Sequence, residues 1–258
     1  MVDRSFADLS LAALYDILNP WGPGDDFYLG FVKGADAVLD VGCGTGQLLR
    51  RARDDGHRGR LVGLDPAAAM LVQARQCADE VEWVLGDLRT RDWAKEFDLV
   101  VMTGHAFQVL LCDEELRAAL EAVRGSLRPG GRFVFETRNP KARAWEGWTP
   151  ERVREVTDPE GCAVRVWNEV ERPVLGDRVT FTETFDSDTW KRPRVSRTTL
   201  RFLGPDHLNR FLGAAGFTVV EQYGDWERGP LTPAASEIIT VAEAGRQPPS
   251  APSAGARP

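Results

Sequence analysis

The chain has 258 residues, of which 43% are hydrophobic and 28% are charged, a composition that suits one large domain with or without an insert. Its formal net charge of −7 argues against a nucleic acid partner, because phosphate binding favours a basic surface. No apolar run approaches the roughly 18 residues of a membrane span, and the N-terminus lacks a signal pattern. We therefore expect a cytoplasmic protein with no membrane segment.

Two helices are predicted ahead of the main fold. Apolar residues recur on one face between Phe6 and Leu18, which indicates a short amphipathic helix. A second helix is predicted over residues 26–33, with Asp25 as its N-cap. We assign residues 1–34 to an N-terminal helical cap.

The stretch A-V-L-D-V-G-C-G-T-G over residues 37–46 organises the rest of the chain. It predicts a buried strand that turns on three glycines into a helix over residues 47–53, which brings bare backbone N–H groups close to a ligand. The spacing differs from the G-x-G-x-x-G of dinucleotide sites. The strand also ends in Asp40, whose carboxylate would repel a pyrophosphate and suit a cation such as an ammonium.

Two further strands end in carboxylates. Residues 60–65 predict a strand that ends at Asp65, followed by a helix with Pro66 in its first turn, and residues 81–87 predict a strand that ends at Asp87. Ligands of open α/β sheets bind at the carboxyl ends of the strands. The three acids therefore predict one ligand site at one edge of a sheet.

The alternation of strands and helices continues through a fourth and a fifth strand. Residues 97–102 predict a strand, Asp113 is the expected cap of a helix that runs to Leu127, and residues 132–136 predict a strand entered through Pro-Gly-Gly. Residues 37–137 together resemble the class I S-adenosylmethionine-dependent methyltransferases, whose motif I the glycine stretch matches. The resemblance implies an α/β fold with a Rossmann-like, seven-stranded, mostly parallel sheet and helices on both faces.

Residues 140–203 depart from this alternation of strands and helices. Alternating polar and apolar residues predict antiparallel strands over 162–171, 178–185 and 194–203, inserted after strand five as a lid or dimer surface. A helix over 205–215 and strands over 217–223 and 238–242 would complete the main sheet. The methyltransferase domain is thus expected over 35–139 and 204–244, and the Pro/Ala/Ser/Gly-rich residues 245–258 are expected to be disordered.

The resemblance implies S-adenosylmethionine as cofactor and S-adenosylhomocysteine as product. It places Asp65 on the ribose hydroxyls, Asp87 and the Leu88 N–H at the adenine, and Tyr15 at the cofactor's carboxylate. Met70 beside the adenine and Tyr15 at the carboxylate are each as consistent with core packing as with this role. The expected cofactor residues are Tyr15, Trp21, Asp40, Gly42, Gly44, Asp65, Pro66, Met70, Asp87, Leu88 and Thr103.

Methyl transfer needs a positioned nucleophile and, for many acceptors, a group that takes a proton. His105 follows strand four, beside the expected cofactor, and is the candidate base or substrate-orienting residue; a histidine that only holds the loop is the alternative. No metal-ligand cluster is visible, so no metal is expected. The candidate substrate residues are Gln108, Arg138, Asn139, Trp145, Trp148 and Trp190.

We therefore predict a bacterial methyltransferase that acts on N or O of a small molecule in secondary metabolism, with a possible homodimer through the insert. Thr-Gly-His-Ala stands after strand four, where enzymes that methylate nucleic-acid bases or protein glutamine carry Asn/Asp-Pro-Pro-Tyr/Trp. Two alternatives stay open. One is a non-catalytic S-adenosylmethionine-binding regulatory or partner protein, and the other is an NAD-type oxidoreductase, which the glycine spacing and Asp40 oppose.

Overall fold

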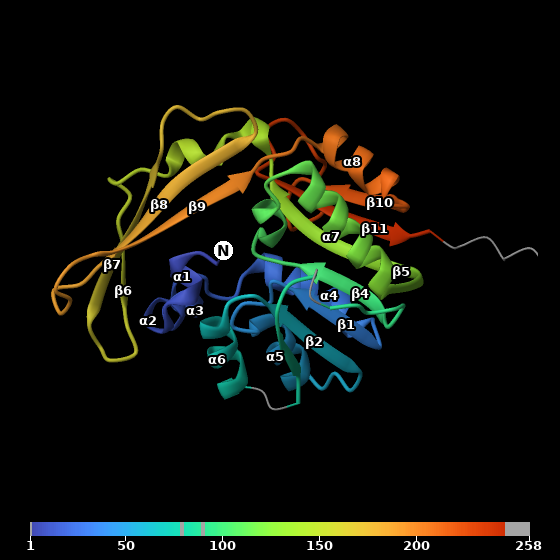
Figure 1. The fold of residues 1–258 in the computed structure, drawn as a ribbon, viewed down its shortest axis with the longest axis horizontal. Helices are drawn as coiled ribbons and strands as arrows, with labels where there is room; N and C mark the ends of the chain where they lie inside the picture. The colour runs from blue at the N-terminus through green and yellow to red at the C-terminus, as the bar shows by residue number, and fades with distance from the viewer. Residues whose placement is uncertain (1, 78–79, 89–90, 246–258) are drawn as a thin grey trace, which may run out of the picture.

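A computed structural model describes residues 2–77, 80–88 and 91–245 (Figure 1). It contains a seven-stranded sheet in the order β10-β11-β5-β4-β1-β2-β3 and a separate four-stranded sheet in the order β6-β7-β8-β9. The expected fold class is therefore confirmed. None of the helices in this described part of the chain has the length and hydropathy needed to cross a membrane, and residues 246–258 of the expected disordered tail lie outside it.

The neighbouring strands from β3 to β5 pair in parallel. Strand β11 pairs antiparallel with β5, and the edge strand β10 pairs antiparallel with β11. Strand β1 pairs with β2 on one side and β4 on the other, so the strand order reverses at β1. Such a reversal leaves a crevice at the carboxyl ends of the strands, where ligands bind. The strands are β1 Ala37–Val41, β2 Arg60–Asp65, β3 Glu82–Leu85, β4 Phe97–Met102, β5 Leu127–Arg138, β10 Phe217–Tyr223 and β11 Glu237–Ala244.

Helices cover both faces of this sheet (Figure 1). The apolar sides of α7 and α8 pack in one buried cluster with the β5 phenylalanines, and those of α4 and α5 pack in another with Val38 and Val134. The expected N-cap of α4 is wrong, because Asp25 lies inside the helix and its carboxylate accepts the Gly22 N–H at 2.8 Å. The helices are α4 Pro23–Lys33, α5 Gln47–Asp54, α6 Ala68–Cys77, α7 Asp113–Ser126 and α8 Pro205–Ala214, with the 3₁₀ turns η1 Ala106–Val109, η2 Pro140–Ala142 and η3 Ala144–Gly147.

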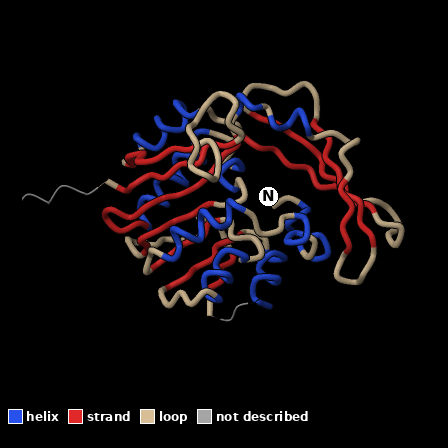
Figure 2. The backbone as a smooth tube through the Cα atoms, turned by 180° about the vertical axis from the view of Figure 1, so that it is seen from behind, coloured by secondary structure: helices blue, strands red, loops and turns tan. Residues whose placement is uncertain are grey.

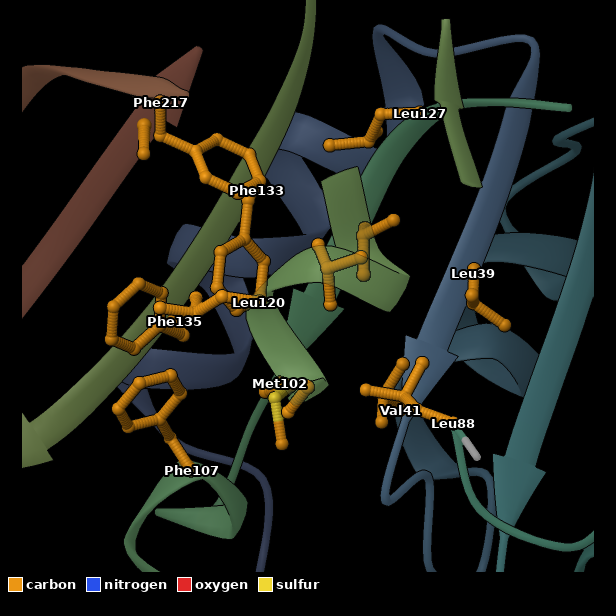
Figure 3. Packing of buried hydrophobic residues seen from close by; sticks show 14 of the residues in the cluster. Leu39, Val41, Leu88, Met102, Phe107, Leu120, Leu127, Phe133, Phe135 and Phe217 are labelled. Atoms are coloured by element: carbon orange, nitrogen blue, oxygen red, sulfur yellow. The ribbon is translucent and has the colours of Figure 1, made fainter. Parts of the chain in front are cut away.

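A column of aromatic rings runs through the core beside β5 (Figure 3). Phe107 stacks on Phe135 with ring centroids 4.3 Å apart, Phe135 on Phe133 at 4.5 Å, and Phe133 meets Phe217 at 5.9 Å. Such ring pairs add stability beyond the area that they bury. Because Phe107 belongs to η1, the column fixes the turn that directly follows His105.

The four-stranded sheet contains β6 Arg154–Thr157, β7 Ala163–Val170, β8 Arg178–Asp186 and β9 Arg194–Arg201, all paired antiparallel. The last three match the strands expected in the insert to within one or two residues. Strand β6 was not predicted, because a four-residue strand is too short to show a period-two pattern.

The single helix expected between Phe6 and Leu18 is wrong. The structure has three short helices instead, α1 Arg4–Ala7, α2 Leu9–Ala12 and α3 Tyr15–Leu18. Asp8 takes an extended conformation and its carboxylate accepts the Ser10 N–H at 3.1 Å, so it ends α1 and caps α2. An aspartate that bonds to nearby backbone competes with helix continuation, which explains the break.

These short helices lie between the two sheets (Figures 1 and 2). The Ser5 N–H donates to Ser196 Oγ on β9 at 2.9 Å, and the Thr198 hydroxyl donates to Asp3 at 2.7 Å. On the other side, Ala12 packs with Met70 of α6. The N-terminal helices therefore join the second sheet to the end of the main sheet where β1, β2 and β4 finish.

Glycine at position 63 is required by the packing of Trp83. A Cβ there would lie 2.5 Å from the Trp83 ring and 2.9 Å from Cys43 Sγ, both closer than real side chains approach. Trp83 thus packs directly across the backbone of β2, which fixes the strand that leads to Asp65.

We expect Gly63→Ala to lower the free energy of unfolding by about 1–3 kcal/mol, the usual cost of overpacking a core. Gly125→Ala is the matched control, because a Cβ at that position in α7 meets nothing within 4 Å. Removing glycine from a helix interior should stabilise the protein by about 0.5–1 kcal/mol. Urea denaturation measures both, and equal stability of the two variants would contradict this packing argument.

Candidate functional site

The loop after β1 runs through glycines in the left-handed region and is shaped by Asp65. Gly42, Gly44 and Gly46 have φ of +76°, +55° and +74°, which favours glycine at all three positions. Asp65 at the end of β2 accepts the Gly44 N–H at 2.9 Å and the Ala67 N–H at 2.7 Å. The carboxylate therefore holds the glycine loop against the start of α6.

Asp40 is the most deeply buried acid of this loop. Its side chain belongs to a residue 1% exposed, and its Oδ1 has no hydrogen-bond partner. Burial, together with the charges of Asp65, Glu136 and Asp25, raises the pKa of Asp40 to about 8. A shielded carboxyl with a free oxygen fits a ligand that brings a cation or a hydrogen-bond donor, as the ammonium of S-adenosylmethionine would.

Tyr15 lies across the loops that follow β1 and β4. A Cβ on Gly44 would lie 3.8 Å from the Tyr15 ring, and one on Gly104 would lie 3.3 Å from the phenol oxygen. Burial raises the pKa of Tyr15 to about 12, so the phenol stays protonated and can donate a hydrogen bond. The next residue, Asp16, anchors this helix by accepting the Thr45 hydroxyl at 2.5 Å.

Glu136 at the end of β5 holds the loop after β4. It is 2% exposed, accepts the hydroxyl of Tyr28 from α4, and accepts the backbone N–H of His105 at 2.7 Å. His105 has φ of +63°, a left-handed conformation that non-glycine residues rarely adopt. Strained backbone of this kind persists where the surroundings fix it, and Glu136 supplies that constraint here.

The His105 side chain is paired with a carboxylate. Its Nε2 lies 3.0 Å from Glu237 Oε2, and both side chains are largely shielded, at 19% and 15% exposed. Glu237 starts β11, where it pairs in register with Arg138 at the end of β5. Glu237 is not among the residues predicted from the sequence, although the amino end of an antiparallel strand lies at the same edge as the carboxyl ends of its parallel neighbours.

Arg138 and Gln108 link this edge to the second sheet. Gln108 Oε1 accepts the backbone N–H of Arg138 at 3.2 Å and its guanidinium at 3.3 Å, and Gln108 Nε2 donates to the Arg201 carbonyl at 2.9 Å. The Arg138 guanidinium also lies 5.3 Å from the centre of the Trp148 ring. Arg138 therefore stands at the junction of β5, η1 and the insert.

Three of the expected site residues make contacts within the protein. The Asn139 amide donates to the carbonyls of Thr232 and Ala235, and the Trp21 indole donates to Asp26 at 2.8 Å. Trp190 packs against the cluster that contains Leu11 and Phe185, with the Arg194 guanidinium 3.9 Å from its ring centre. The Asn139 contacts join residues more than 90 positions apart, so a local sequence pattern does not show them.

The other expected residues differ in exposure: Met70, Leu88, Pro66, Asp87 and Thr103 lie on or after β2, β3 and β4, and Trp145 lies in η3 beside the insert. Met70 is buried, and Leu88 has its side chain in the core. Trp145 is buried against Phe202 at 4.6 Å between ring centroids, and its Nε1 has no partner. Pro66, Asp87 and Thr103 follow β2, β3 and β4 and are at least partly exposed.

The described part of the chain also contains the kinds of side chain that bind metal ions. His, Cys, Asp and Glu side chains do not gather there in a group of three that could hold an ion. The described cysteines Cys43, Cys112 and Cys162 are free.

Comparison with known proteins agrees with this geometry. Residues 38–131 match the family model described as a methyltransferase domain. A trans-aconitate 2-methyltransferase of Azoarcus sp. strain BH72 is 35% identical over 202 residues, which cover 70% of this chain and 76% of that protein.

Two further relatives act on amino sugars according to their names. The dTDP-3-amino-3,6-dideoxy-α-D-glucopyranose N,N-dimethyltransferase of Streptomyces fradiae is 32% identical over 136 residues, 49% of this chain and 52% of its own length. The structure of S-adenosylmethionine-bound CalS10, an amino pentose methyltransferase from Micromonospora echinaspora, superimposes with a TM-score of 0.64 at 26% identity and covers 90% of this chain and 96% of its own. The chain belongs to the class I S-adenosylmethionine-dependent methyltransferases that act on small molecules.

Proposed function

We propose that the protein transfers a methyl group to an amine nitrogen of a small hydroxylated molecule. The observation that carries the proposal is the His105–Glu237 pair, which stands beside the buried Glu136 at the edge where β4, β5 and β11 meet. The paired histidine at this edge also favours catalysis over a role limited to binding the cofactor.

Among the residues of this chain, Asp40, Asp65 and the glycine loop would hold S-adenosylmethionine, with Tyr15 above it. When bound, the cofactor supplies a methyl group on a sulfonium, ready for in-line displacement. The shielded Asp40 oxygen would take the ammonium, and Asp65 has lone pairs left for ribose hydroxyls. Tyr15 and the short helices would exclude water from the reacting atoms.

An amine acceptor needs a base, because most amines are protonated near neutral pH and an ammonium has no lone pair for attack. His105 can take that proton, and Glu237, 3.0 Å from Nε2, would stabilise the imidazolium that forms. Glu136 and Glu237 also make the edge anionic, which attracts a cationic acceptor. A carboxylate acceptor would need neither effect.

The direct test is a methyl-transfer assay read by mass. The probes are dTDP-3-amino-3,6-dideoxyglucose, the methyl glycoside of 3-amino-3,6-dideoxyglucose, and trans-aconitate. We expect a mass increase of one or two methyl groups on an amino sugar, and transfer to trans-aconitate alone would overturn the proposal.

Arg138 favours a second candidate, O-methylation of a carboxylate. Its guanidinium stands at the same edge and is largely shielded from water, so it could hold an acidic acceptor. The relative named as a trans-aconitate methyltransferase gives this candidate further support. The carboxylates around His105 make it the weaker of the two, because they repel an anion.

Asp40 should couple stability and cofactor binding to pH. Its pKa is about 8 in the folded protein and about 3.9 in an unfolded chain, so the folded state binds more protons between these values. The free energy of unfolding should therefore fall as pH rises through this window, and Asp40→Asn should flatten the fall. Urea denaturation at pH 5 and pH 8 measures this change in the free energy of unfolding, and Asp54→Asn, at an exposed position, is the control.

The same residue should release a proton when an ammonium binds beside it, because a nearby cation lowers the pKa of a carboxyl. Calorimetry with S-adenosylhomocysteine in two buffers of different ionisation enthalpy counts that proton. Equal proton release by the wild type and Asp40→Asn would show that Asp40 does not face the ammonium.

We expect His105→Ala to reduce turnover by about 10²–10⁴, the usual contribution of a general base, with unchanged affinity for S-adenosylhomocysteine. Glu237→Gln keeps a hydrogen-bond acceptor but removes the charge, so it should cost less turnover than His105→Ala. His207→Ala on α8 is the matched histidine control. If His105→Ala turns over within about threefold of the wild type, the base assignment fails.

A further inference from the structure

The inward face of the four-stranded sheet carries a polar row between two apolar clusters. Asn168 of β7, Glu183 of β8 and Ser196 of β9 are neighbours across the strands. On one side of this row Val166 and Phe185 pack with the N-terminal helices, and on the other lies a cluster that contains Val170, Val179, Leu200 and Trp145. Packing alone would favour apolar residues in the middle of such a face.

Two side chains of the row lack close hydrogen-bond or ion-pair partners within the described part of the protein. The Asn168 Oδ1 is shielded from water and has no hydrogen-bond partner. Glu183 is 22% exposed, and the nearest charge, the half-exposed Arg154, stands 3.9 Å away. Burial correspondingly raises the pKa of Glu183. Buried polar groups without close partners destabilise a fold, so they call for an explanation by function.

The neighbouring hydroxyls of β9 are already in use. Ser196 Oγ accepts the Ser5 N–H, and the Thr198 hydroxyl donates to Asp3. The N-terminal helices thus cover the β9 end of the row, while Asn168 and Glu183 remain on the β7 and β8 side.

Aromatic contacts connect this row to the proposed active site. The Arg138 guanidinium lies 5.3 Å from the Trp148 ring centre, and Trp148 contacts Phe181 with centroids 4.7 Å apart. Phe181 precedes Glu183 by two residues on β8, so both side chains lie on the same face of the sheet. An acceptor that reaches from His105 past Arg138 and Trp148 would next meet Glu183 and Asn168.

We propose that Asn168 and Glu183 form an acceptor-binding subsite that takes hydrogen-bond donors, hydroxyl or amino groups, away from the methylated nitrogen. A carboxylate and an amide oxygen both accept hydrogen bonds, and Glu183 repels anionic groups. The inference rests on the proposed function and adds that the part of the acceptor over this row is hydroxylated or cationic rather than phosphorylated. Both residues would act as specificity determinants rather than in the chemical step.

The test compares Glu183→Gln and Asn168→Val with the wild type on two amine acceptors. One is the methyl glycoside of 3-amino-3,6-dideoxyglucose, and the other is cyclohexylamine, which lacks hydroxyls. Each variant should raise KM for the amino sugar about tenfold or more, change kcat less than threefold, and leave KM for cyclohexylamine unchanged. Glu169→Gln, an exposed carboxylate on the opposite face of β7, is the control.

Stability and cofactor binding separate this role from a structural one. Both variants should keep the wild-type affinity for S-adenosylhomocysteine, and both should melt at or above the wild-type temperature, because each removes a poorly satisfied buried group. A lower melting temperature, or equal KM changes for both acceptors, would overturn the subsite. If the wild type methylates no amine, the proposed function fails, and the melting temperatures still decide whether the two side chains serve the fold.

Discussion

The burial of several carboxylates at one edge of the main sheet is the constraint on which the site depends. Asp40, Asp65 and Glu136 are each less than 10% exposed, and Glu237 lies close by. Like charges held out of water repel one another, so each must find a donor or stay protonated. Asp65 uses two loop N–H groups and Glu136 uses Tyr28 and the His105 N–H, whereas Asp40 keeps a free oxygen. Among these buried carboxylates, Asp40 is therefore the one with a shielded oxygen that has no hydrogen-bond partner.

The parts of this arrangement that follow local rules could be predicted from the sequence. Glycines between a strand and a helix, and acids at strand ends, are adjacent in the chain, and they led to Asp40, Gly44 and Asp65. The pairing of His105 with Glu237 could not be predicted in this way, because it joins residues 132 positions apart through the register of β5 with β11. The same limit applies to Asn139, whose partners Thr232 and Ala235 are set by tertiary packing.

Alternation predicted a half-polar sheet in the insert but did not show which polar residues face inward. Glu183 and Glu169 both occupy strands of similar composition, yet Glu183 lies on the shielded face and Glu169 on the exposed one. A shift of one residue in register would exchange the two faces, so their identity depends on the three-dimensional pairing. The break of the N-terminal helix at Asp8 has a local origin instead, since the Asp8 side chain caps α2 through the Ser10 N–H.

The N-terminal helices connect the two halves of the proposed site, because they contact both sheets. Asp16 bonds to Thr45 in the glycine loop, Tyr15 covers Gly44 and Gly104, and Ser5 bonds to Ser196 beside Glu183. Each of these helices has only four residues, too few for a stable helix in isolation, so their order derives from these contacts. Residues 3–18 therefore join the proposed cofactor site to the surface of the second sheet that is proposed to meet the acceptor.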